Sequence, residues 1–93
     1  MKTLEKIYLI LTEKLAASFL DVKDDSAEHA GHKEAEKSGG GHFAITIVSS
    51  AFEGKPLTER HRMVYALLRD EFKNEIHALG IKAYTLSEWE KIN

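Results

Sequence analysis

Apolar residues near the start of the chain recur every three or four positions, which is the period of a helix with one buried face. The pattern predicts a helix from about Leu4 to Ser18, with Thr3 as a candidate N-cap. Charged residues interrupt the stretch, so we interpret it as a folded helix and not as a signal peptide. The expected buried stripe consists of Leu4, Ile7, Tyr8, Leu11 and Leu15.

The same period returns after Pro56 and predicts the longest helix of the chain. Proline disfavours helix in the residue before it, so the helix should begin just after Pro56, with Thr58 as the candidate N-cap. Arg60, Arg62 and Arg69 are expected mostly on the faces away from the core. The expected buried stripe consists of Met63, Val64, Leu67, Leu68 and Phe72.

Three segments show extended character. The first, Phe19 to about Asp25, is short and increasingly acidic, which suits the edge of a sheet. The second, His42–Ser49, is rich in β-branched residues and nearly apolar on both faces, which indicates a central strand. The third is Ala78–Tyr84, and Thr85 to Glu88 forms the pattern of a capping box that opens a last short helix.

The predicted fold is therefore α+β in the order αββαβα, a three-stranded mixed sheet with helices packed on one face. The helix between the second and third strands makes them parallel, and the first two strands are expected to be antiparallel. Residues 1–93 form a single domain. A glycine- and histidine-containing loop at about residues 26–41 is predicted to be mobile, because loops of this length in small domains tend to be functional or disordered.

Composition narrows the possible functions. The 93 residues include no cysteine, which excludes disulfides and a thiol nucleophile and fits a reducing compartment. Because the sequence shows no signal or membrane-spanning segment, we expect a cytoplasmic protein, with an organellar location as the alternative. No apolar run approaches the roughly 18 residues of a membrane span. A formal charge of −2 argues against nucleic acid as the main partner. No phosphate loop, catalytic triad or paired-carboxylate motif indicates an enzyme.

Five histidines are the chemical signal of the chain. His29 and His32 have a spacing that suits metal ligation, but two solvated imidazoles would have the same spacing. His77, at the junction between the central helix and the third strand, is suited either to capping a carbonyl or to binding a ligand. His42 begins a strand on the side of Thr46 and is expected to pack or to form a hydrogen bond.

Short motifs stand in a fixed order along nearly the whole chain. They are Asp24-x-Ser26, His29, His42-Phe43, Val48-Ser49, Phe52-x-Gly54, Arg60-His61-Arg62-x-Val64-Tyr65, Leu68, Glu71, Ile76-His77-Ala78-Leu79 and Thr85-x-x-Glu88-Trp89. This set of motifs resembles the BolA family. The fold of that family, a KH-like arrangement of class II type without the RNA-binding G-x-x-G loop, has the αββαβα order predicted above. In this chain the corresponding position, Gly54 to Leu57, also lacks the second glycine.

The resemblance implies a partner and a cofactor. BolA-like proteins pair with monothiol glutaredoxins and share a [2Fe-2S] cluster, which the glutaredoxin cysteine and a glutathione thiol hold on one side. The position of the histidine ligand before the third strand is His77 here. The second ligand comes from the loop between the first two strands, where alignment favours His29, with His32 as the alternative. The chain would then be a non-enzymatic adaptor in iron–sulfur trafficking or iron regulation, with no cofactor when isolated.

The family resemblance also implies a competing hypothesis. Some BolA proteins are described as DNA-binding transcriptional regulators that act through the central helix. In this chain that role would fall on the Arg60-His61-Arg62 triplet and on Lys55 and Arg69. The charge distribution favours the cluster partnership.

Overall fold

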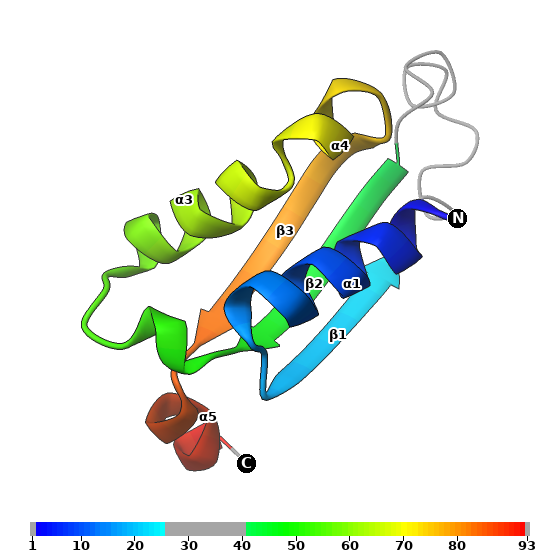
Figure 1. Cartoon of the computed structure of the whole chain (residues 1–93). Coiled ribbons are helices and arrows are strands. Elements are labelled where there is room, and N and C mark those ends of the chain that lie inside the picture. The colour runs from blue at the N-terminus through cyan, green and yellow to red at the C-terminus, as the bar shows by residue number, and fades with distance from the viewer. Residues whose placement is uncertain (1, 26–40, 93) are drawn as a thin grey trace.

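The computed structural model of the chain describes residues 2–25 and 41–92 (Figure 1). Its single sheet has the strand order β1-β2-β3, so the second strand is central and the first lies at an edge, as predicted. The predicted fold class and element order are confirmed, apart from a break in the central helix. The elements are α1 (Thr3–Leu15), β1 (Phe19–Asp24), β2 (Gly41–Val48), η2 (Ser50–Phe52), α3 (Leu57–Leu67), α4 (Arg69–Asn74), β3 (Ile76–Tyr84) and α5 (Leu86–Ile92).

The pairing within the sheet follows the predicted directions. β1 and β2 are antiparallel, with Phe19 opposite Val48, and β2 and β3 are parallel, with Ile45 opposite Ile81. α1 lies across β1 and β2, and α3 runs beside β3 on the same side of the sheet (Figure 1). The opposite face of the sheet carries no helix along its length among the described elements.

The hydrophobic core fills the space between the sheet and these helices. Successive residues of a strand point to opposite faces, so every second residue of β2 faces the core. Burying one large aliphatic side chain stabilises the fold by about 1.5–3 kcal/mol relative to leaving it exposed. Within the described ranges, no helix has both the length and the apolar character needed to cross a membrane. The most deeply buried members of the core cluster are Ile7, Leu11, Ile45, Ile47, Phe52, Val64 and Leu68.

The first helix differs from its predicted form at both ends. It ends at Leu15 and not at Ser18, because Ala16 adopts a left-handed conformation with φ 46°. Thr3 is the first residue of the helix and not its N-cap, and its Oγ1 donates to Glu75 Oε1 at 3.1 Å. Tyr8, placed in the buried stripe by its spacing, is 45% exposed, so that assignment was wrong.

The predicted central helix is divided into α3 and α4 at Leu68. The backbone of Leu68 leaves helical geometry (φ −103°, ψ 16°), and its N–H contacts the carbonyls of both Val64 and Tyr65 at 3.2 Å. The side chain of Leu68 is fully buried, so the break lies within the core-facing stripe. The N-cap is Pro56 and not Thr58, since α3 already begins at Leu57.

Arg60 is buried, which contradicts its predicted place on an exposed helix face. Only 7% of the residue is exposed, and its guanidinium contacts both carboxylate oxygens of Glu88, at 2.6 and 3.1 Å. It also donates to the carbonyl of Lys55 at 2.8 Å and to that of Ala83 at 3.1 Å. Such a bidentate pair is both strong and geometrically specific. Arg60 therefore ties α3 to the end of β3 and to α5.

The capping box predicted at Thr85 is confirmed. The Thr85 N–H donates to Glu88 Oε1 at 2.9 Å, and the Glu88 N–H donates to Thr85 Oγ1 at 3.3 Å. The hydrogen bond from Arg60, together with the one from the Thr85 backbone, lowers the pKa of Glu88 from 4.5 to about 2. The Glu88 carboxylate thus caps the first turn of α5 and also joins α5 to α3 through Arg60.

Replacing Arg60 by methionine should destabilise the fold, because the carbonyls of Lys55 and Ala83 lose their donor. We expect the free energy of unfolding in urea to fall by about 1–3 kcal/mol. The matched control is Arg62→Met on the same helix, where an exposed ion pair with Glu59 is lost and the expected change is below about 0.5 kcal/mol. Equal effects of the two substitutions would contradict the anchoring role of Arg60.

The stabilisation from Glu88 should depend on pH. Because folding lowers the pKa of this carboxyl, the folded state gains stability above pH 4.5 and loses that gain as pH falls toward 2. The difference in urea midpoint between the wild type and Glu88→Gln should therefore be full at pH 6 and shrink steadily between pH 4.5 and 2. A difference that stays constant over this range would show that the ion pair with Arg60 does not stabilise the fold.

Candidate metal-ligand site

His77 lies at an irregularity in the pairing of β2 and β3. Gly41 pairs with Ile76 and His42 pairs with Ala78, so His77 is an extra residue of β3 without a partner in β2. Strict alternation counted back from the buried Leu79 would turn His77 into the core and Ile76 toward solvent. The extra residue reverses this: Ile76 is 3% exposed and His77 is exposed. Bulges of this kind redirect side chains at functional sites.

The backbone around this bulge is held by hydrogen bonds from three elements. The Gly41 N–H donates to the carbonyl of Glu75 at 2.9 Å, and the Asp25 N–H donates to the carbonyl of His42 at 2.7 Å. The Glu75 carboxylate accepts from Lys6 at 2.8 Å, and this hydrogen bond is the main reason why the pKa of Glu75 is lowered. The start of α1 is thereby fastened to the residue that precedes Ile76.

His42 lies beside His77. The ring centroids of the two histidines are 5.1 Å apart and their planes are inclined by 51°. The sequence indicated packing or a hydrogen bond for His42 and did not connect it with His77. A signal was nonetheless present, because each histidine is the second residue of its strand, and parallel neighbours begin at the same edge of a sheet.

The other predicted ligands, His29 and His32, lie outside the described residues, as does the predicted mobile loop apart from its last residue, Gly41. The described residues on either side of that segment are Asp25 and Gly41, and both are hydrogen-bonded at the bulge. Within residues 2–25 and 41–92, no three histidine, cysteine, aspartate or glutamate side chains converge on a common point. A metal held by His77 and at least two further protein side chains therefore needs ligands beyond this described set.

The residues proposed for DNA contact are not equivalent in the structure. Arg60 is buried against Glu88 and is not available at the surface. Lys55, Arg62 and Arg69 are exposed, and Arg62 pairs with Glu59 at 3.0 Å. The Arg60-His61-Arg62 triplet thus contributes one surface arginine, Arg62, and a half-buried histidine, His61.

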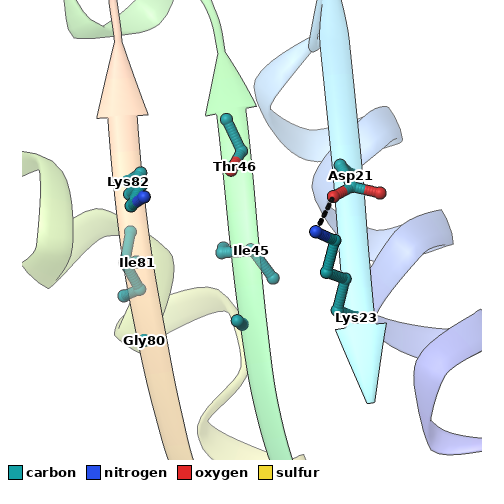
Figure 2. A pocket seen from close by; sticks show the side chains of 8 residues that line it. Asp21, Lys23, Ile45, Thr46, Gly80, Ile81 and Lys82 are labelled. Atoms are coloured by element: carbon teal, nitrogen blue, oxygen red, sulfur yellow. Dashed lines mark ion pairs between the residues drawn. The ribbon is translucent and has the colours of Figure 1, made fainter. Parts of the chain in front are cut away.

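A shallow hollow of about 350 Å³ lies on the helix-free face of the sheet (Figure 2). Its lining includes the small residues Ala44 and Gly80, and Lys82 stands at one side. Lys23 and Asp21 border the other side, with a distance of 4.0 Å between Nζ and Oδ2. Neither His42 nor His77 lines this hollow, so it is separate from the histidine pair.

Comparison with protein families identifies a relationship over most of the chain. Residues 11–88 match the family described as BolA-like protein. This range includes the bulge, both histidines of the described site and the Arg60–Glu88 pair.

Individual relatives carry the same domain. The chain is 38% identical over 84 residues to the DNA-binding transcriptional regulator BolA of Escherichia coli, covering 86% of this chain and 76% of that protein. It is 46% identical over 82 residues to SufE-like protein 1 of Arabidopsis thaliana, covering 84% of this chain but only 22% of that protein. Among solved structures, the BolA domain of SufE1 from Arabidopsis thaliana matches with a TM-score of 0.79 and 44% identity, covering 91% of this chain and 93% of that one.

Adjacent alanine substitutions test the bulge. Ile76→Ala should lower the free energy of unfolding by about 2–4 kcal/mol, because it empties a buried position of the core. His77→Ala should change it by less than about 0.5 kcal/mol, because the imidazole is outside the core. Urea unfolding of both variants measures the difference. The reverse order of effects would mean that His77, and not Ile76, faces the helices.

Proposed function

The chain belongs to the BolA family, and we propose that it is a non-enzymatic adaptor that binds a monothiol glutaredoxin and shares a [2Fe-2S] cluster with it. The observation that carries this proposal is the placement of His77. Its imidazole is exposed at the end of a sheet, on a backbone held by hydrogen bonds. An imidazole in such a position is accessible to a partner without any disturbance of the core.

The donor groups of the chain fit one side of such a cluster. His77 would supply one imidazole, and His29, or alternatively His32, would supply the second. Thiolates must come from the glutaredoxin cysteine and from glutathione, since this chain has no cysteine. When bound, a cluster with two imidazoles on one iron has a higher reduction potential than one held by thiolates alone.

The local structure supports a ligand from the segment between β1 and β2. Asp25 and Gly41, which flank residues 26–40, are hydrogen-bonded to His42 and Glu75, the neighbours of the bulge. A chain that leaves and returns at this corner has both ends close to His77. We therefore propose that this segment supplies His29 or His32 as the second ligand.

A histidine ligand suits delivery or sensing better than rigid electron transfer. Imidazole can be protonated near physiological pH and can be replaced by another ligand, so a cluster held in this way is exchangeable. We therefore place the adaptor in iron–sulfur cluster trafficking or iron regulation.

DNA binding has less support as the function of this chain. The Escherichia coli relative is named a DNA-binding transcriptional regulator, and the exposed Lys55, Arg62 and Arg69 are the cations with which this chain would contact phosphates. However, Arg60 forms an ion pair with Glu88, and Arg62 forms one with Glu59. The formal charge of the chain is −2, which also disfavours contact with a phosphate backbone. Electrostatic contact with DNA would produce a steep fall in affinity with added salt, and a flat dependence would count against this function.

Anaerobic reconstitution with a monothiol glutaredoxin, glutathione, iron and sulfide tests the cluster proposal. We expect a heterodimer whose visible absorption and circular dichroism differ from those of the glutaredoxin homodimer. His77→Ala should abolish or alter that spectrum, because one iron loses a protein ligand. His61→Ala on α3 is the matched control and should leave the spectrum unchanged.

The loop variants complete the same experiment. His29→Ala should change the heterodimer spectrum if His29 is the second ligand, and His32→Ala should do so if the alternative holds. Absence of a complex, or a spectrum that is indifferent to every histidine, would exclude the cluster function. The salt dependence of DNA affinity would then be the next measurement.

A further inference from the structure

We propose that His42 and His77 together bind a divalent transition-metal ion, of which zinc is the example, in the chain without a partner protein. The proposal rests on the side-by-side placement of the two imidazoles at the start of β2 and β3. This zinc site does not require a glutaredoxin, although His77 is a ligand in both proposals.

The separation of the rings fits two imidazoles on one ion. Zinc binds histidine nitrogen at about 2.0–2.1 Å, which puts each ring centroid about 3.2 Å from the metal. When the angle at the metal between the two nitrogens is tetrahedral, the two ring centroids are roughly 5 Å apart. The observed separation of the ring centroids is 5.1 Å, and the ring planes are inclined by 51°. Rotation about the side-chain bonds can then direct one nitrogen of each ring to a shared ion.

The backbone holds both histidines in place before any ion arrives. His42 pairs with Ala78 in the sheet, and its carbonyl accepts a hydrogen bond from Asp25 at 2.7 Å. His77 follows Ile76, whose side chain is fixed in the core. The fold has therefore already met the backbone cost of bringing the two imidazoles together, which favours binding of an ion by both.

The donor set also determines which ions are suitable. Neutral imidazole suits zinc, copper and nickel, whereas magnesium and calcium prefer oxygen ligands. No third acidic, histidine or cysteine side chain joins the pair within the described parts of the chain. Water would fill the remaining positions, as it does in open zinc sites. The site is therefore weaker than a four-ligand structural site and leaves positions open for exchange.

Zinc titration of the full chain alone tests the proposal, by calorimetry at pH 7.5 and by long-range ¹H–¹⁵N spectra of the histidine rings. Saturating zinc should shift one ring nitrogen each of His42 and His77. His42→Gln and His77→Gln should each weaken zinc binding at least tenfold. His61→Gln, and the double variant His29→Gln/His32→Gln, should retain the affinity within threefold.

Several results would overturn the proposal. Zinc affinity that survives His42→Gln, or that disappears in the His29→Gln/His32→Gln variant, would assign the ion to other ligands. If His42→Gln does not fold, the wild-type spectra still decide, because an unshifted His42 ring at saturating zinc excludes it as a ligand. No glutaredoxin is present, so failure here leaves the cluster proposal intact, and failure of the heterodimer leaves this one intact.

Discussion

Ile76 and His77 face opposite surroundings because one residue of β3 has no partner in β2. Regular pairing would direct the imidazole toward the helices and expose the isoleucine, which would place an aromatic nitrogen base in an apolar core. The bulge allows both side chains to reach suitable environments: Ile76 joins the core, and the imidazole stands at the end of the sheet beside His42. The site chemistry thus depends on a single irregularity in a parallel strand pair, which hydrogen bonds from Gly41 and Asp25 keep in place.

A second constraint acts at the other end of the sheet. Arg60 and Glu88 join α3 to α5, and the same carboxylate closes the capping box with Thr85. The Arg60-His61-Arg62 triplet is therefore not a continuous basic surface. Arg60 supports the fold, and Arg62 is the one arginine of the triplet that lies at the surface. The two ends of the domain therefore differ: Arg60 and Glu88 join helices at the end that carries α5, and an imidazole, that of His77, is exposed at the other end.

Much of the fold could be predicted from the sequence. The alternation in His42–Ser49 and the helical spacing around Val64 predicted a central strand and a core-facing helix, because burial imposes those periods directly. The bulge could not be predicted, since it depends on register between strands that are far apart in the sequence. The burial of Arg60 was missed for a related reason: helical spacing indicates a face, but it does not reveal a carboxylate that arrives from residue 88. His77 was identified as a candidate ligand from the sequence, whereas its proximity to His42 emerged only from the paired strands.

Pulsed electron paramagnetic resonance of the reduced heterodimer, with this chain labelled with ¹⁵N at histidine, tests the role of His77 most directly. Coordination predicts a strong coupling between the cluster and a labelled histidine nitrogen, and this coupling should be lost or reduced when His77 is replaced by alanine. A cluster that shows no coupling to histidine nitrogen of this chain would contradict the proposed ligand. So would a coupling that remains unchanged in the His77→Ala variant.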